Sequence, residues 1–158
     1  MKLVTNIALL IACLALAAPV ANAMSAKDKE KVVSLFTDTS IPAERSTEAM
    51  NEGDAPYKII HLRFTSGGQK YSAKLFLSKG VQSMSVDVLY EDYAYNVDDI
   101  NGDGIVDEVS NSIVYKTVNG DDITEGPLNV DEKTVTELSV LYRKTIHAML
   151  VYYKANKK

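Results

Sequence analysis

A run of oxygen-bearing side chains lies between Asp98 and Glu108. Four of them follow a spacing of two residues, interrupted once at Ile105: Asp99, Asn101, Asp103 and Asp107. Gly104 lies inside the same run. Calcium takes roughly six to eight oxygen ligands at about 2.3–2.6 Å, and alternate residues of a tight loop can all direct oxygen atoms inward. The spacing therefore predicts a loop that wraps a hard cation.

The pattern D-x-N-x-D-G-x-x-D in residues 99–107 resembles the calcium loops of EF-hands, dockerins and thrombospondin type 3 repeats. The resemblance covers only this loop and implies which residues bind the ion. The expected ligands are the side chains of Asp99, Asn101 and Asp103, the backbone carbonyl of Ile105, and Asp107 either directly or through water. In this pattern Gly104 permits the sharp turn that brings the chain back around the ion.

Two features depart from an EF-hand. An EF-hand has a bidentate glutamate at the twelfth loop position, which here is Ser110. Glu108 or Asp98 is therefore left to complete the site, and we include Glu108 in the predicted ligand set. The flanking residues favour strands over helices, which predicts a loop between two strands and no calmodulin-like opening. Without the bidentate ligand, we expect a dissociation constant of about 10⁻⁴–10⁻³ M.

Two simpler explanations compete with a calcium site. Asn-Gly and Asp-Gly are common turn residues, but a plain turn does not need oxygen atoms at four alternate positions. Magnesium demands stricter octahedral geometry, so calcium is favoured.

Lys and Arg are absent between Lys79 and Lys116, and this acidic segment repels itself unless a cation neutralises it. The same charge argues against nucleic acid as a partner of this surface.

The first 23 residues have the features of a secretory signal peptide. A positive start at Lys2 precedes a mainly apolar run, and Ala21-Asn22-Ala23 is a small-residue cleavage site. Cleavage after Ala23 predicts a periplasmic or secreted protein, residues 24–158, with no membrane association. A transmembrane helix is the weaker interpretation of the run. A lipoprotein anchored at Cys13 is a minor alternative, because the sequence stays apolar beyond Cys13. The predicted mature chain has no cysteine and forms no disulfides, so a bound metal is a reasonable substitute restraint.

We expect a single α+β domain. Residues 25–39 predict a short helix with Ser25 as its cap, and residues 129–155 predict a long helix with an apolar stripe at spacings of three and four. Between them, alternating apolar residues and the turns at Gly67-Gly68 and Asn119-Gly120 predict an antiparallel meander of about four to five strands. The long helix should pack on this sheet. Residues 41–56 are polar and bracketed by Pro42 and Pro56, which predicts a linker.

The sequence supports three hypotheses of function. The first is an exported calcium-binding domain in which Ca²⁺ orders the loop at residues 98–108. The alternative is a protein-interaction module, an inhibitor or assembly factor, whose acidic loop meets a basic partner without a metal. A hydrolase using loop carboxylates ranks third, because no nucleophile elbow, zinc helix or nucleotide-binding motif is present, and we assign no catalytic residue. His61 and His147 are expected to be ordinary surface residues.

Overall fold

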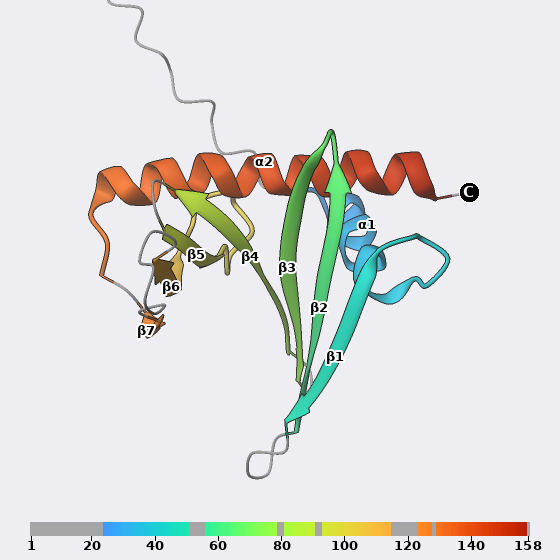
Figure 1. Cartoon of the computed structure of the whole chain (residues 1–158), viewed down its shortest axis with the longest axis horizontal. Helices are drawn as coiled ribbons and strands as arrows, with labels where there is room; N and C mark the ends of the chain where they lie inside the picture. The colour runs from blue at the N-terminus through green and yellow to red at the C-terminus, as the bar shows by residue number, and fades with distance from the viewer. Residues whose placement is uncertain are drawn as a thin grey trace, which may run out of the picture.

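The computed structural model describes residues 24–50, 56–78, 81–90, 93–114, 123–127 and 129–157. In these ranges, seven strands form one antiparallel sheet in chain order, and two helices flank them in sequence (Figure 1). The strands are β1 (Glu44–Met50), β2 (Tyr57–Ser66), β3 (Gln69–Ser78), β4 (Val81–Tyr90), β5 (Tyr93–Asp98), β6 (Glu108–Val114) and β7 (Ile123–Pro127). The helices are α1 (Ala26–Thr37) and α2 (Glu132–Asn156). The predicted signal peptide with Cys13, and the Asn119-Gly120 turn, lie outside the described residues.

The predicted α+β class and meander are confirmed, but the number of strands was underestimated. The predicted linker at residues 41–56 was wrong, because residues 44–50 form β1, which pairs with β2 from Glu44↔Arg63 to Met50↔Tyr57. The other missed strand is β7, which pairs with β6. Both are edge strands of the sheet.

Each helix begins at a side chain that accepts a hydrogen bond from its first turn. The Ser25 hydroxyl oxygen accepts from the backbone N–H of Asp28, as the capping pattern predicts, and the Asp131 carboxylate accepts from Thr134 N–H at 2.7 Å. Asp131 is thus the cap of α2. None of the helices in the described ranges is long and apolar enough to cross a membrane.

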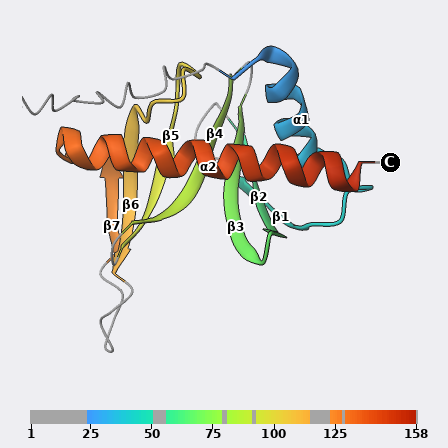
Figure 2. The ribbon, with the colours of Figure 1, turned by 90° about the horizontal axis from the view of Figure 1, so that it is seen from above.

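The hydrophobic core lies between one face of the sheet and the two helices. Alternate residues of the central strands are buried, as in Leu62, Leu75 and Val86, each at most 1% exposed. The apolar stripe of α2 covers them with Leu138 and Met149, both fully buried. Figure 2 shows α2 running across all the strands, so the long helix packs on the sheet as predicted.

The two central hairpins separate at one end. The β2–β3 hairpin turns at Gly67 and Gly68, which have positive φ values of 57° and 78°. The pairing of β3 with β4 stops at Ser72↔Asp87, whereas β2–β3 and β4–β5 remain paired beyond that point. Figure 1 shows β4 leaning away from β3 towards one end of α2. The sheet is therefore split beside the helix.

Candidate metal centre

The loop between β5 and β6 is organised around the carboxylate of Asp99. One oxygen, Oδ1, accepts from the N–H groups of Gly102 and Asp103 at 2.7 and 3.1 Å, and the other, Oδ2, accepts from Gly104 N–H at 2.9 Å. Gly104 has φ +87°, a left-handed conformation that glycine adopts without strain. The first predicted ligand therefore faces the inside of the loop, and the predicted turn at Gly104 is present.

The other predicted side-chain ligands also turn back onto the loop backbone. The side-chain oxygen of Asn101 accepts from Asp103 N–H, and Asp103 Oδ1 accepts from Ile105 N–H, each at 2.8 Å. Asp107 reaches across from the far end, where its Oδ2 accepts from Ile100 N–H at 2.8 Å and Asn101 N–H at 3.2 Å. Carboxylates from both ends of the loop thus engage its N-terminal turn.

Three contacts tie the loop to the rest of the fold. The backbone N–H of buried Val106 donates to Ser139 Oγ on α2 at 3.0 Å. Arg143, one helical turn further, donates from Nη1 to the carbonyl of Gly104 at 2.7 Å. At the N-terminal side, Met24 N–H donates to Gly102 O at 3.1 Å. The apolar side chain of Val106 packs in the core, which fixes the base of the loop.

Tyr142 lies beneath the loop and is 2% exposed. Burial raises the pKa of its hydroxyl, and the negative charge of Asp99, to which it hydrogen-bonds, raises that pKa further. The phenol therefore stays neutral and supplies a donor to the same carboxylate that gathers the loop amides.

Asp98 and Glu108, the candidates for the missing ligand, lie on the strands beside the loop, as does Ser110 at the twelfth loop position. Asp98 pairs across the strands with Ser85 and with Glu108, and Ser110 pairs with Asn96, so all belong to the sheet face opposite α2. Burial raises the pKa of Asp98 to about 6, and the nearby charge of Glu108 adds to the effect. Asp98 Oδ1 and Ser85 Oγ are buried and have no hydrogen-bond partner among the described residues. The Glu108 side chain is exposed, and its place in the ligand set stays a prediction.

The donor set has a chemistry suited to calcium, although its oxygens are held by hydrogen bonds. Asp99 Oδ1 and Asp107 Oδ2 each accept from two N–H groups, whereas the side-chain oxygen of Asn101 and Asp103 Oδ1 each accept from one and keep a second lone pair for a cation. Within the described ranges, no three His, Cys, Asp or Glu side chains are grouped closely enough to hold a metal ion by themselves. A calcium ion here would also need neutral oxygens such as the Asn101 amide and the Ile105 carbonyl, as the loop pattern implies.

The sequence did not reveal the residues that support the loop from α2. Ser139, Tyr142 and Arg143 share one side of the helix, and their spacing of three and four was readable. That they contact the loop between β5 and β6 was not readable. The part of the sheet that a helix crosses depends on tertiary packing, which the sequence does not give. Comparisons with protein-family models, with curated proteins and with solved structures found no match for this chain.

Proposed function

We propose that this chain is a small exported calcium-binding domain in which the ion orders the loop between β5 and β6. One observation carries the proposal. The carboxylates of Asp99 and Asp107, at opposite ends of the loop, both point into its N-terminal turn and both engage the backbone there. Like charges gathered in one small loop repel each other, so a divalent cation would lower the free energy of this arrangement.

The role of the ion in this proposal is structural. The loop lies over α2 through Ser139 and Arg143, and its base, Val106, belongs to the core. Calcium that binds only the folded loop would stabilise the whole domain by mass action, by about 2.7 kcal/mol at a hundredfold excess over the dissociation constant. This would compensate for the absence of disulfides in the predicted mature chain.

The first prediction tests calcium binding through stability. Thermal unfolding is followed for wild type and Asp103→Ala, each with millimolar calcium and with chelator. Calcium should raise the Tm of wild type, and Asp103→Ala should lose most of that rise because one anionic ligand is gone. Glu137→Ala, an exposed acid on α2, is the matched control and should keep the full rise. An equal Tm for wild type in calcium and in chelator would refute the proposal.

A second candidate function is supported by two exposed apolar side chains on the same loop. Ile100 is 66% exposed and Ile105 is 45% exposed, and both lie among acidic residues. An apolar tip surrounded by negative charge suits a basic partner protein. This interaction module predicts binding that weakens with salt and persists in chelator. A pull-down at two salt concentrations, with and without chelator, separates it from a calcium-dependent role.

A further inference from the structure

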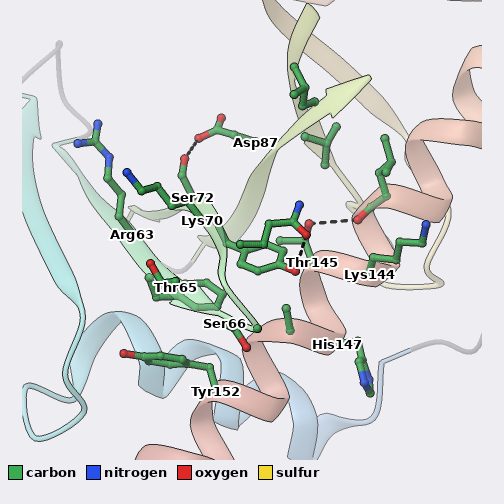
Figure 3. Close-up of a pocket in the computed structure, with 18 of the residues that line it drawn as sticks. Arg63, Thr65, Ser66, Lys70, Ser72, Asp87, Lys144, Thr145, His147 and Tyr152 are labelled. Carbon is green, nitrogen blue, oxygen red and sulfur yellow. Dashed lines mark hydrogen bonds between the residues drawn. The ribbon is translucent and has the colours of Figure 1, made fainter. Parts of the chain in front are cut away.

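A large groove opens where the β2–β3 and β4–β5 hairpins separate. We call it the hairpin groove; its sides are the ends of the two hairpins and its floor is α2. Its volume is about 1990 Å³, and it is open to solvent. Figure 3 shows Arg63, Lys70 and Ser72 on one side and Lys144 and His147 on the helix. This groove is separate from the acidic face of the calcium loop, although Arg143 belongs to its lining and also bonds the loop.

Apolar side chains make up much of the groove wall. The lining includes Phe64, Tyr71, Leu89, Leu141, Val151 and Tyr152. Leu89 is 62% exposed and Val151 is 44% exposed, the largest such exposure on β4 and on α2 among the described residues. Exposed apolar residues in a concave surface are typical of a binding site.

Positive charge surrounds this apolar surface. Arg63, Lys70 and Lys144 line the groove, and none of them forms an ion pair with a carboxylate in the described part of the chain. The lining also holds two acids, Glu44 and Asp87, but with Arg143 it has four Lys and Arg side chains, so its charge is net positive. The chain as a whole has a formal net charge of −4, so a cationic groove is a local feature that favours an anionic partner.

The strand edges indicate what kind of anion fits. Residues 69–71 of β3 and 88–89 of β4 border the groove and are not paired with each other, because the β3–β4 ladder ends at Ser72↔Asp87. Unpaired strand edges offer backbone donors and acceptors to an added strand. The groove is also larger than the roughly 300–1,000 Å³ of most small-molecule pockets. Main-chain hydrogen bonding and size therefore both favour a peptide.

We propose that the hairpin groove binds an extended acidic peptide segment of a partner protein. The segment adds to the edge of β3 at residues 69–71 and places alternate apolar side chains on the α2 floor. Its carboxylates point to the other face of the sheet, towards Lys70 and Arg63, while Lys144 adds positive charge from α2. Alternation follows from strand geometry, since successive side chains point to opposite sides. The proposal is independent of calcium binding by the loop.

The test uses a synthetic peptide of alternating glutamate and valine, measured by isothermal titration calorimetry with the full mature chain. The wild-type protein should bind it, and the lysine–valine counterpart should bind at least about tenfold more weakly. Lys70→Glu combined with Lys144→Glu should weaken the acidic peptide by about tenfold. Methylating the amide nitrogens of the peptide removes its ladder donors and should also weaken binding.

A matched control has the same change of charge outside the groove. Lys27→Glu combined with Lys133→Glu alters two exposed residues in the first turns of the two helices, and peptide affinity should stay within about twofold of wild type. Equal loss in both double variants, or no binding of the acidic peptide, overturns the proposal. If the methylated peptide binds with unchanged affinity, the peptide does not bind by adding a strand to β3. Binding of laurate in place of the peptide, abolished by Lys70→Glu with Lys144→Glu, would assign the groove to a lipid-like anion instead.

Discussion

Ser139 joins the loop between β5 and β6 to α2 through a single buried hydroxyl. Its oxygen accepts from Val106 N–H and its proton is donated to the carbonyl of Val135 at 2.7 Å, so both hydrogen-bonding roles are used. The residue is 3% exposed, which excludes water as a ready replacement. A serine inside a helix that bonds its own turn is ordinary, whereas the second bond to a loop 33 residues away is specific to this fold.

Ser139→Ala should therefore destabilise the protein by about 1–3 kcal/mol, because the buried N–H of Val106 loses its acceptor. Equilibrium unfolding in urea measures the loss. Thr136→Ala is the control, since the Thr136 hydroxyl makes the same kind of bond to a helix carbonyl, Glu132 O, but is exposed and not bonded to the loop. Equal destabilisation by the two variants would show that the bond to Val106 contributes nothing.

The predicted ligands show how far residue-level inference reached. The alternate oxygens and Gly104 were readable because they act within one short segment, where spacing alone decides which atoms meet. The role of Tyr142, a buried donor to Asp99, was not readable, since a tyrosine in an apolar helical stripe has the pattern of a core residue. Whether Ca²⁺ binds these residues stays a prediction.

At the level of elements, the helices were the most predictable part and the edge strands the least. The α2 stripe has a regular period over its whole length, and its cap at Asp131 is a local signal. By contrast, β1 has the sequence Glu-Arg-Ser-Thr-Glu-Ala-Met, which contains good helix formers and no apolar alternation. It is a strand because the exposed edge of β2 supplies hydrogen-bond partners, and this tertiary contact overrides local propensity.

The cap of α2 gives a prediction with a defined pH dependence. The hydrogen bonds from Thr134, first that of its backbone N–H, lower the pKa of Asp131 in the folded protein. A lowered carboxyl pKa contributes stability above the ordinary carboxyl pKa and loses it as the pH falls through the acid range. Asp131→Ala should reduce the Tm at neutral pH, and the gap to wild type should narrow in acid.

Asp131→Asn is the matched variant, because asparagine also caps helices but does not titrate in this range. Its Tm should lie nearer to wild type than that of Asp131→Ala at neutral pH. Thermal unfolding followed by circular dichroism at neutral and acid pH gives all three values. If the difference in Tm between wild type and Asp131→Ala is the same at every pH, the ionised carboxylate of Asp131 is not the source of that difference.

For the molecule as a whole, the buried residues form one continuous core. Val106 from the loop, Val32 from α1, Leu75 from β3 and Leu138 from α2 all belong to the same cluster of contacting side chains. Since the base of the loop is part of this cluster, releasing the loop exposes residues that the sheet and α2 also need. We therefore expect the loop and the core to unfold together, in a single two-state transition.

Coincident unfolding curves are the measure of this cooperativity. Urea unfolding of an Ile100→Trp variant is followed by far-ultraviolet circular dichroism for the helices and by the fluorescence of the new tryptophan for the loop, with calcium and with chelator. Ile100 is exposed, and the chain has no other tryptophan. If the proposed calcium site exists, both curves should shift together to lower urea concentration in chelator. Calcium that binds only the folded state stabilises the whole domain, so its removal lowers the midpoint of the single transition. A loop that loosened first would move the fluorescence curve while the helical signal stayed in place. That separation would show that the loop unfolds independently, and that the ion stabilises only the loop and not the rest of the fold.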